Sequence, residues 1–561
     1  MLYETTLTRE DADHFRAAGW WPDRLLNDAL ALAVARYPGR TALVDARGRM
    51  SYATLQAQVD QCALGFLAVG IRHGDVVTAQ LPNWNEFVVL TLALERIGAV
   101  INPVAPIFRQ RELRVMLRLA GSVAAVIPDS FRGWDFAEMY AELQADAPEL
   151  KRLVVIDGDS DGRDNSILSW SQLLARGAAL PGDREALDWL RPSPDDVTAL
   201  LFTSGTTGEP KGVMHTANTL GAILEAMIER LQLTDGDVFH MASTVGHMTG
   251  YEMGVRLPLY LGARAVYQDL WDAKKFIRLI EAERVTFTLG ATPFLADTLR
   301  ASNLAQHDIR SLRKFVCGGA AIPRPLAVEA VTHLSCQLVP CWGMTEIGPA
   351  TMTHPDDPIE RVVAADGCVY PQMELTVRDP HGAGCAPGNE GDLYTRGAFV
   401  FAGYVQGRKF TQQFFTPDGW FATGDRGVMD AAGYVRITGR SKDIIIRAGE
   451  NIPVKEIEDV LMQHPNVRSV ALVGMPDARL GEIACACIIP EPCKTFALPE
   501  MQKFLAAQQV TRQFWPERVQ VMDAFPTTPS GKVQKFELRQ MLASSEETEA
   551  LVCSAAAAPA R

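Results

Sequence analysis

A glycine- and hydroxyl-rich loop is the segment of this chain with the clearest chemical potential. Residues 200–213 read LLFTSGTTGEPKGV, and the apolar run at 198–202 predicts a strand that leads directly into the loop. Glycines let backbone N–H groups approach an anion closely, four hydroxyl side chains add donors, and Lys211 adds a positive charge. The spacing is not that of a Walker A motif, because Lys211 follows a proline and precedes a glycine. The residues alone leave a phosphate-binding loop and a flexible surface turn as alternatives.

The same loop resembles the phosphate-loop signature of the adenylate-forming superfamily. That family includes acyl- and aryl-CoA synthetases, peptide-synthetase adenylation domains and beetle luciferase. Its other motifs follow in order within about residues 25–540. They read GGAAIP at 318–323, WGMTE at 342–346, TGD at 423–425, GRSKDIIIRAGENI at 439–452 and PSGKVQK at 529–535. Because the motifs occur in the family's order, the resemblance is specific.

The resemblance implies an enzyme that activates a carboxylic acid with ATP. A carboxylate oxygen attacks the α-phosphorus, pyrophosphate leaves, and the thiol of coenzyme A then displaces AMP. Charge develops on phosphate oxygens, so such catalysis depends mostly on positioning and electrostatics. The expected ligands are a small carboxylic acid, ATP, Mg²⁺ and CoA as co-substrate.

The resemblance assigns the nucleotide-binding residues one by one. The phosphate loop would comprise Thr203, Ser204, Gly205, Thr206, Thr207, Gly208 and Lys211, and the rest of the site would comprise Gly318, Gly319, Ala320, Trp342, Gly343, Met344, Thr345, Asp425 and Arg440. Asp425 would accept hydrogen bonds from the ribose hydroxyls, with Arg440 beside it, although an aspartate here could also cap a turn. Trp342 replaces the family's commoner tyrosine but keeps a flat face for adenine, and a core tryptophan is a compatible interpretation.

Four residues receive catalytic roles in the same way. Lys532 would bridge the carboxylate and the α-phosphate with its flexible ammonium group. Thr345 would contact the α-phosphate, and Glu346 would bind Mg²⁺, which prefers carboxylate and phosphate oxygens. His247 would gate the acyl pocket. The competing interpretations are a solvated lysine, a surface glutamate and a structural histidine.

The acyl pocket and the CoA site are also implied by the resemblance. The expected pocket residues are Val245, His247, Met248, Met253, Thr292 and Met344. The uncharged members suit a compact apolar acid, and the absence of an aspartate near this place argues against an amino-acid substrate. Lys442 would be a hinge between two orientations of the C-terminal domain, and Gly449, Glu450 and Asn451 would approach the CoA arm.

Segments outside these motifs resemble CoA ligases of the alicyclic ring-acid branch, such as cyclohexanecarboxylate–CoA ligases. They are LPNW at 81–84, IGAVINPVAP at 97–106, IFRQREL at 107–113 and FRGWDF at 131–136. Aromatic acids and short or medium fatty acids stay as alternative substrates, since one methylene changes binding by only about 1–3 kcal/mol. Three other functions are alternatives: an acid–AMP ligase that loads a carrier protein, a luciferase-like oxygenase, and an inactive nucleotide sensor. The sensor is disfavoured because Glu346, Asp425 and Lys532 are all present.

The elements that must position these residues alternate between strand and helix. Strands are expected at 76–81, 99–101, 124–127, 153–156 and 284–289, with an amphipathic helix at 84–97, and this alternation predicts parallel sheets covered by helices. Residues 360–440 predict a small antiparallel or barrel-like unit. A helix at 453–462 and strands at 467–473 and 485–489 follow.

With the resemblance, this pattern predicts a multidomain α/β protein. Residues 1–439 would form a large N-terminal domain of two α/β sheet subdomains plus a small β-barrel-like subdomain. Residues 440–545 would form a small, mobile α+β C-terminal domain, and residues 546–561 a flexible tail.

Composition argues against a protein that binds nucleic acid or an anionic membrane, or that spans a membrane. The 561 residues carry 54 basic and 67 acidic side chains, a net charge of −13. Such a chain lacks the basic excess that nucleic acid or an anionic membrane attracts. The longest apolar runs, 29–35 and 398–405, are far shorter than the roughly 20 residues of a membrane span.

Cysteine usage and the N-terminus predict the compartment. The ten cysteines include no C-x-x-C pair, so reduced thiols are expected, with Cys485 and Cys487 as small core residues. The acidic N-terminal segment is unlike a targeting peptide. A cytoplasmic enzyme is expected, and a homodimer is compatible with the sequence.

Overall fold

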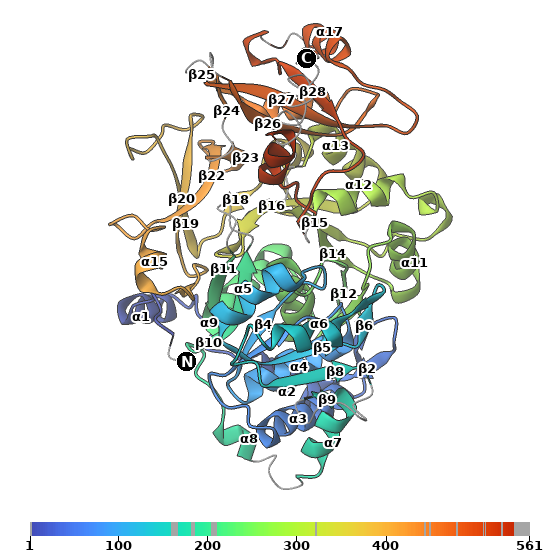
Figure 1. Cartoon of the computed structure of the whole chain (residues 1–561), viewed down its shortest axis with the longest axis vertical. Coiled ribbons are helices and arrows are strands. Elements are labelled where there is room, and N and C mark those ends of the chain that lie inside the picture. The colour runs from blue at the N-terminus through green and yellow to red at the C-terminus, as the bar shows by residue number, and fades with distance from the viewer. Residues whose placement is uncertain are drawn as a thin grey trace, which may run out of the picture.

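The computed structural model describes residues 3–158, 167–180, 186–203, 210–319, 322–441, 445–447, 450–477, 481–508, 510, 512–528 and 531–543. Within these residues the chain is a mixed α/β protein, as predicted. A large N-terminal part holds two large sheets, a four-stranded sheet and the small pair β6 (Ser130–Phe131) and β7 (Trp134–Asp135), and a smaller C-terminal part holds a fifth sheet (Figure 1). The predicted tail at 546–561 lies outside the described residues.

An eight-stranded sheet has the order β21-β11-β10-β4-β3-β5-β8-β9. Its strands are β3 (Val76–Ala79), β4 (Val100–Pro103), β5 (Ser122–Pro128), β8 (Arg152–Ile156), β9 (Ile167–Ser169), β10 (Val197–Thr203), β11 (Lys211–Thr216) and β21 (Gly403–Tyr404). The run from β10 to β9 is parallel, whereas β11 and β21 pair antiparallel at one edge.

Helices cover both faces of this sheet. The main ones are α3 (Tyr52–Ala68), α4 (Asn85–Arg96), α5 (Gln110–Ala120), α6 (Phe136–Leu143) and α7 (Trp170–Ala178). Ala124 and Val126 of β5 pack in the core that contains α3 and α4, whereas Ala125 and Ile127 pack with α5 and α6. Successive side chains of a strand point to opposite faces, so a strand buried on both sides needs a continuous apolar run. The predicted strands at 76–81, 99–101, 124–127 and 153–156 and the helix at 84–97 are confirmed.

A nine-stranded sheet has the order β18-β17-β16-β15-β14-β12-β13-β1-β2. Its strands are β1 (Thr41–Val44), β2 (Arg49–Ser51), β12 (Val238–Met241), β13 (Arg264–Tyr267), β14 (Phe287–Gly290), β15 (Lys314–Gly318), β16 (Gln337–Met344), β17 (Gly348–Met352) and β18 (Cys368–Val369). Strands β16 to β1 run parallel, and α11 (Ala273–Glu283), α12 (Thr292–Arg300) and α13 (Arg324–His333) connect them. The strand predicted from residue 284 begins only at Phe287, because Arg284 caps α11 in the left-handed conformation (φ +56).

Further helices belong to the N-terminal part. They are α1 (Arg9–Ala17), α2 (Leu26–Arg36), α8 (Ala186–Trp189), α9 (Ala217–Leu231), the π-helix η1 (Thr249–Arg256), α10 (Leu257–Leu261), α14 (Ile359–Ala364) and α15 (Arg408–Gln412). Residues of α2, α4, α9 and η1 share one hydrophobic core with strands of both large sheets. The two sheets are therefore held in a fixed relation by buried helices.

The predicted small unit is an antiparallel four-stranded sheet in the order β19-β20-β22-β23. Its strands are β19 (Met373–Arg378), β20 (Glu390–Gly397), β22 (Phe421–Met429) and β23 (Val435–Arg440). Their register brings Asp425 of β22 opposite Arg440 of β23. The sheet thus carries two of the predicted nucleotide-binding residues side by side.

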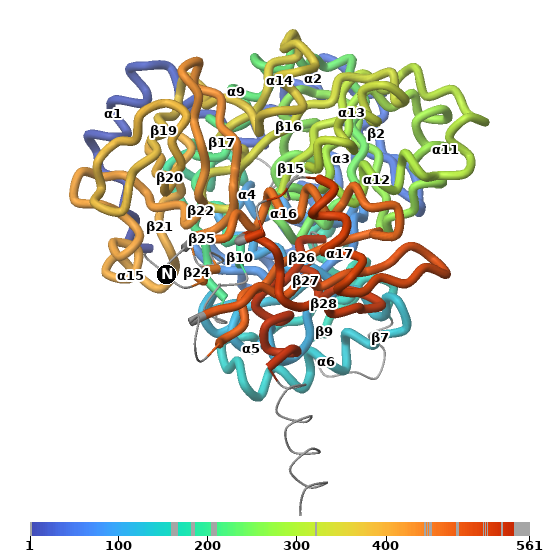
Figure 2. Tube along the Cα trace, turned by 90° about the horizontal axis from the view of Figure 1, so that it is seen from above, coloured from blue at the N-terminus to red at the C-terminus, as the bar shows by residue number. Residues whose placement is uncertain are grey.

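The C-terminal sheet contains β24 (Ile445–Arg447), β25 (Glu450–Ile452), β26 (Val467–Asp477), β27 (Gly481–Pro490) and β28 (Arg518–Val521). With α16 (Val454–Leu461) and α17 (Leu498–Ala507) it has a hydrophobic core of its own. Cys485 and Cys487 are buried in β27, as predicted, and the cysteines among the described residues are free. This part lies at one end of the molecule and, seen from that end, in front of the N-terminal sheets (Figures 1 and 2).

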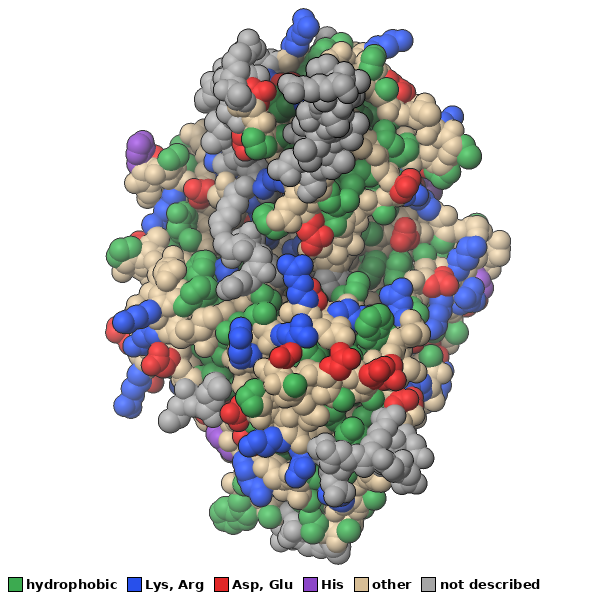
Figure 3. All heavy atoms as spheres, in the orientation of Figure 1, with side chains coloured by type: hydrophobic (Ala, Val, Ile, Leu, Met, Phe, Trp, Pro, Cys, Tyr) green, Lys and Arg blue, Asp and Glu red, His purple; other side chains and the backbone are tan. Residues whose placement is uncertain are grey.

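The surface carries both signs of charge. On the face shown in Figure 3, Lys and Arg side chains are interspersed with Asp and Glu among the coloured residues. Within the described parts of the chain, no helix combines the length and the apolar character needed to cross a bilayer.

Candidate active site

Three of the predicted motifs lie at the carboxyl ends of strands from the two large sheets. β10 ends at Thr203, β15 at Gly318 and β16 at Met344. In α/β proteins, ligands bind at such carboxyl ends, where loops leave the sheet. The motifs that follow these three strands therefore lie where a ligand is expected to bind.

The stems of the predicted phosphate loop are paired strands. Thr203 of β10 lies opposite Lys211 of β11 in an antiparallel ladder. Ser204, Gly205, Thr206, Thr207 and Gly208 lie outside the described residues. The Lys211 ammonium lies 4.0 Å from the centre of the Phe414 ring and 5.3 Å from that of Tyr404. Both ends of the loop are thus anchored beside the site.

Thr345 and Glu346 occupy a tight turn between β16 and β17. A Cβ atom added to Gly343 would lie 1.8 Å from the carbonyl oxygen of Gly348. Only glycine permits so close an approach of two backbones, and Gly348 itself has φ +57. The glycine of the WGMTE motif is therefore required to shape the turn that presents Thr345 and Glu346.

Glu346 is a buried carboxylate, 3% exposed. Its Oε1 accepts a hydrogen bond of 2.7 Å from the Tyr404 hydroxyl, whereas its buried Oε2 has no hydrogen-bond partner among the described residues. Burial raises the pKa of this carboxyl, and the Tyr404 hydrogen bond opposes that rise. A half-satisfied buried carboxylate fits a ligand of Mg²⁺, which commonly takes one or two protein carboxylates and completes its shell with substrate phosphates and water. No cluster of three His, Cys, Asp or Glu side chains suited to a metal occurs in the described part of the chain.

The neighbouring Thr345 is held by its main chain. Nε2 of His215, on β11, donates a hydrogen bond of 2.8 Å to the Thr345 carbonyl oxygen, since a carbonyl can only accept. Nδ1 of the same ring lies 3.1 Å from the Thr219 hydroxyl. His215 is fully buried, and burial lowers its pKa to about 4, so the ring is neutral at pH 7.

Asp425 is fixed through both of its oxygens. Oδ2 accepts a hydrogen bond of 2.8 Å from the Trp342 indole, and Oδ1 accepts one of 3.0 Å from Arg440 Nε. Asp425 is 6% exposed and Trp342 is 7% exposed. Trp342 is therefore a core residue that also orients the predicted ribose ligand.

Lys532 reaches this site from the C-terminal part. A Cβ added to Gly319, which has φ +83, would lie 3.5 Å from Lys532 Cε. Burial lowers the pKa of Lys532, as does the charge of Arg440, whereas the charges of Asp425 and Glu346 raise it. Burial, followed by the charge of Lys532, lowers the pKa of His247 to about 4. Residues far apart in the sequence thus share one electrostatic environment.

The predicted acyl-pocket residues lie on three segments. Val245, His247 and Met248 precede η1, and Met253 lies within it. Thr292 begins α12, and Met344 ends β16. Val245, Met248 and Met253 are buried, and the other three are partly exposed. The Nδ1 atom of His247 accepts a hydrogen bond of 3.3 Å from the Thr249 backbone.

Of the predicted hinge and CoA residues, the structure describes only some. Lys442, Gly449 and the predicted nucleotide-binding residue Ala320 lie outside the described residues. Glu450 and Asn451 begin β25, where the main chain of Asn451 pairs with Ile446.

Sequence reasoning missed two residues, Tyr404 and His215. A signal existed for His215: in strand β11 it lies four residues after Lys211 and so faces the same side of the sheet. Tyr404 has no such signal, because its contact with Glu346 spans 58 residues of sequence.

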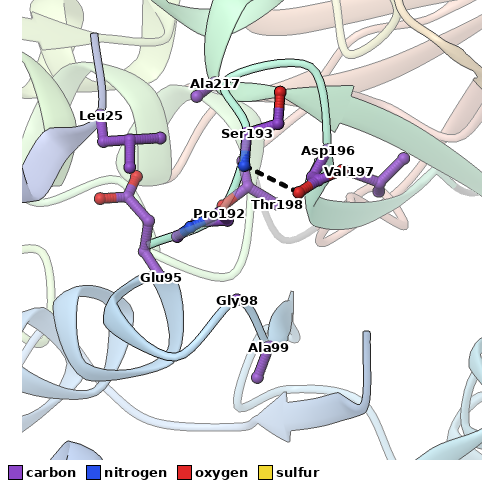
Figure 4. Close-up of a pocket in the computed structure, with 10 residues that line it drawn as sticks. All are labelled: Leu25, Glu95, Gly98, Ala99, Pro192, Ser193, Asp196, Val197, Thr198 and Ala217. Carbon is purple, nitrogen blue, oxygen red and sulfur yellow. Dashed lines mark hydrogen bonds between the residues drawn. The ribbon is translucent and has the colours of Figure 1, made fainter. Parts of the chain in front are cut away.

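A separate small pocket lies between α4 and the segment that precedes β10 (Figure 4). It is lined by Leu25, Glu95, Gly98, Ala99, Pro192, Ser193, Asp196, Val197, Thr198 and Ala217. The volume of about 10 Å³ is at the limit for a single water, too small for a nucleotide or an acid. Both oxygens of Glu95 already accept hydrogen bonds from the main chain of α2. This pocket does not compete as a substrate site.

Comparisons with known proteins show the family of this chain. Residues 30–405 match the family model described as AMP-binding enzyme, and residues 456–532 match the AMP-binding enzyme C-terminal domain. The chain is 37% identical to the medium-chain fatty-acid–CoA ligase of Escherichia coli (strain K12), over 96% of this chain and 94% of that protein. It is 32% identical to the 2,3-dihydroxybenzoate-AMP ligase of Bacillus subtilis (strain 168), over 95% of this chain and 96% of the relative.

A solved structure confirms the fold. The crystal structure of ATP-bound MatB from Rhodopseudomonas palustris superposes with a TM-score of 0.81 at 28% identity, covering 91% of this chain and 98% of that one. Family model, relatives and fold all span most of the chain. The protein therefore belongs to the AMP-binding enzyme family and is an adenylate-forming acid ligase.

Proposed function

We propose that this enzyme converts a compact apolar carboxylic acid, ATP and CoA into an acyl-CoA, AMP and pyrophosphate. One observation carries the proposal: Lys532, from the C-terminal part, lies beside Gly319 in the same electrostatic environment as Glu346 and Asp425. A cation at this place can neutralise two anions that must meet. A solvated surface lysine would have neither the burial nor these neighbours.

In the first step a carboxylate oxygen of the acid attacks the α-phosphorus of ATP. The new C–O–P linkage forms as the bond from the α-phosphorus to the bridging oxygen breaks, and the electron pair leaves with pyrophosphate. The Lys532 ammonium stabilises charge on the carboxylate and the α-phosphate, and Thr345 donates to an α-phosphate oxygen. Oriented donors and cations in a site shielded from water supply most of the rate enhancement in such reactions.

The nucleotide is oriented by residues outside the reacting centre. Asp425, held by Trp342 and Arg440, accepts hydrogen bonds from the ribose hydroxyls. Lys211 and the loop at 203–208 bind the outer phosphates. Glu346 would hold Mg²⁺ through its free oxygen, and the ion would neutralise phosphate charge.

In the second step the CoA thiolate attacks the acyl carbonyl carbon. A C–S bond forms, the C–O bond to AMP breaks, and AMP leaves with the electron pair. We propose that the domain of residues 440–545 rotates about Lys442 between the steps, so that Lys532 withdraws and the segment around Gly449 approaches the pantetheine arm of CoA.

The proposed acid is a ring acid such as cyclohexanecarboxylate, or an aromatic or medium-chain acid. The named relatives support this range, since one is a medium-chain fatty-acid ligase and another is a dihydroxybenzoate ligase. Val245, Met248 and Met253 are buried and uncharged, which suits an apolar acyl group better than a second carboxylate. ATP and CoA as substrates support a cytoplasmic enzyme.

The second candidate is an acid–AMP ligase that transfers the acyl group to a carrier protein. It is favoured by the salicyl-AMP ligase / salicyl-S-ArCP synthetase of Mycobacterium tuberculosis (strain ATCC 25618 / H37Rv), which is 33% identical over 95% of this chain. Both candidates require the same adenylation site and differ only in the thiol that accepts the acyl group.

Pyrophosphate release from Mg·ATP tests the proposal. The acids to be scanned are cyclohexanecarboxylate, benzoate, salicylate, hexanoate and octanoate, each with and without CoA. Repeated turnover that requires CoA supports the CoA ligase. A single turnover that CoA does not change favours the carrier-loading enzyme, and no release with any acid contradicts the proposed substrate range.

A further inference from the structure

The turn that carries Thr345 and Glu346 is held by the edge of the other large sheet. Strands β11 and β21 are neighbours at that edge. From β11, His215 Nε2 donates to the Thr345 carbonyl over 2.8 Å, and from β21, the Tyr404 hydroxyl donates to Glu346 Oε1 over 2.7 Å. The Phe401 N–H, just before β21, donates to the Glu346 carbonyl over 2.9 Å. Two hydrogen bonds from strands of the other sheet, and a third from the segment just before β21, therefore hold the turn.

Among these three donors, His215 has the most narrowly defined hydrogen-bonding state. Its side chain is fully buried, and both ring nitrogens have partners. Since the carbonyl of Thr345 can only accept, Nε2 must carry the proton, and in the neutral ring Nδ1 can only accept. It shares the hydrogen of the Thr219 hydroxyl with the Thr216 carbonyl oxygen, which lies 3.1 Å from that hydroxyl. The ring donates in one direction only, toward the peptide that links Thr345 to Glu346.

We propose that His215 is a positioning residue for adenylation, which fixes the Thr345–Glu346 peptide through its Nε2–H donor and thereby places the α-phosphate contact and the metal ligand. This inference rests on the proposed roles of Thr345 and Glu346. A rotation of that peptide moves the Thr345 side chain and the Glu346 carboxylate together. Because both groups act on phosphate oxygens, a shift of about 1 Å costs on the order of 100-fold in rate.

The chain provides a matched control in His240. This residue is also buried, on β12, and its two ring nitrogens lie 3.1 Å from the Thr288 hydroxyl and 3.2 Å from Gln268 Oε1. Neither of these partners belongs to the proposed nucleotide site. Substituting His240 therefore removes a similarly buried and hydrogen-bonded imidazole without contacting the Thr345–Glu346 turn.

Two substitutions of His215 test the hydrogen bonds of its two ring nitrogens separately. The amide nitrogen of glutamine reaches about the position of Nε2, whereas that of asparagine reaches about the position of Nδ1. His215→Gln can keep the bond to Thr345, and His215→Asn cannot. His240→Asn and His240→Gln serve as the paired controls.

The experiment is a rapid-mixing measurement of the first pyrophosphate release from Mg·ATP and an acid without CoA. The burst amplitude measures the fraction of active enzyme, and the rate constant measures adenylation. We expect H215N to lose at least about tenfold in rate constant, with its amplitude kept, and H215Q to stay within about threefold of wild type. The His240 variants should retain the rate constant, whatever their effect on amplitude.

Two outcomes overturn the inference. One is equal rate constants for H215N and H215Q. The other is a loss in H215N that appears only as burst amplitude, as in H240N, since this is the sign of a purely structural role. A wild-type chain that binds Mg·ATP but releases no pyrophosphate with any acid contradicts the proposed function instead. In that case, calorimetric titration with Mg·ATP tests the role of His215. Weaker Mg·ATP binding by H215N than by wild type, with binding restored in H215Q, supports the inference. Equal affinities of the two variants overturn it.

Discussion

Trp342 Nε1 donates a hydrogen bond of 2.8 Å to Asp425 Oδ2, across 83 residues of sequence. The other oxygen of Asp425 accepts from Arg440 over 3.0 Å. Each carboxylate oxygen can accept more than one hydrogen bond, so Asp425 keeps acceptor capacity for ribose hydroxyls. The tryptophan thus does more than offer a flat face, because it fixes the orientation of the predicted ribose ligand.

Replacing Trp342 with phenylalanine should therefore weaken ATP binding. The ring keeps an aromatic face but loses the donor to a charged group, and such hydrogen bonds contribute about 1.5–3 kcal/mol. We expect the KM for ATP to rise about tenfold with a smaller change in kcat. Steady-state kinetics with varied ATP measures this. Trp420→Phe is the control, since Trp420, just before β22, packs on Arg396. Equal effects in the two variants would contradict the prediction.

Removing the Lys532 charge should separate the two half-reactions. Lys532→Ala is expected to slow adenylation on the order of 1,000-fold, because a charge-stabilising group is lost at the reacting centre. Formation of acyl-CoA from a synthetic acyl-adenylate and CoA should change little. Lys535→Ala, which breaks a 2.7 Å pair with Glu458, should leave adenylation within about threefold of wild type. Similar losses in both half-reactions would argue against a role confined to the first.

The pH profile of adenylation should have an alkaline limb set by Lys532. Burial and the charge of Arg440 lower its pKa below the ordinary 10.5. The proposed role of Lys532 requires its ammonium form, so the rate of adenylation should fall as pH rises through this lowered pKa. We expect single-turnover adenylation to lose rate below pH 10.5, and Lys532→Arg to remove that limb. Thioester formation from preformed acyl-adenylate is the comparison, and an identical limb there would assign the titration to another group.

Acid should destabilise the fold partly through His240. Burial lowers its pKa from 6.5 to about 3. Between pH 6.5 and about pH 3 the imidazole is protonated in the unfolded chain but neutral in the folded chain. The free energy of unfolding therefore falls as pH falls below 6.5. Each such group contributes up to about 1.4 kcal/mol per pH unit.

His240→Leu removes this titration. We expect the free energy of unfolding of the variant to fall less steeply than that of wild type between pH 6 and pH 4, by about 1.4 kcal/mol per pH unit. Denaturant unfolding at several pH values measures both slopes. Parallel slopes in the two proteins would show that His240 is protonated in the folded state.

Arg436 links the C-terminal part to the rest of the molecule. Its guanidinium lies 3.2 Å from Asp366 Oδ1 and 3.7 Å from Asp459 Oδ2, and Asp459 belongs to α16. Lys532 lies beside Gly319 in this arrangement, which we propose to be the adenylating one, so the contact should stabilise that orientation. Arg436→Gln should slow adenylation about fivefold, as expected for a partly exposed pair worth about 1 kcal/mol, and leave thioester formation unchanged.

The control for this variant is Arg396→Gln. Arg396 pairs with Glu374 over 2.8 Å within the four-stranded sheet, so its loss removes an ion pair without loosening the C-terminal part. Equal effects of the two substitutions on adenylation would contradict a role for Arg436 in domain orientation.

Much of the fold could be predicted because strand periodicity is local. The apolar run at 124–127 indicated a strand buried on both faces, and Ala124 and Ala125 indeed pack in different cores. The strand expected from residue 284 was wrong at its start. Arg284 adopts the left-handed conformation that ends α11, and the sequence carries no glycine there to signal it.

By itself the sequence determined where the family's motifs lie and so predicted which residues serve the chemistry, since the loop, the WGMTE turn and the segment of Lys532 are short and local. Only the tertiary structure decided what holds them. Trp342 orients Asp425, His215 reaches Thr345 across 130 residues, and Tyr404 binds Glu346 from another sheet. Such contacts depend on how two sheets pack and on which rotamers that packing allows, and neither leaves a periodic or local pattern in the chain.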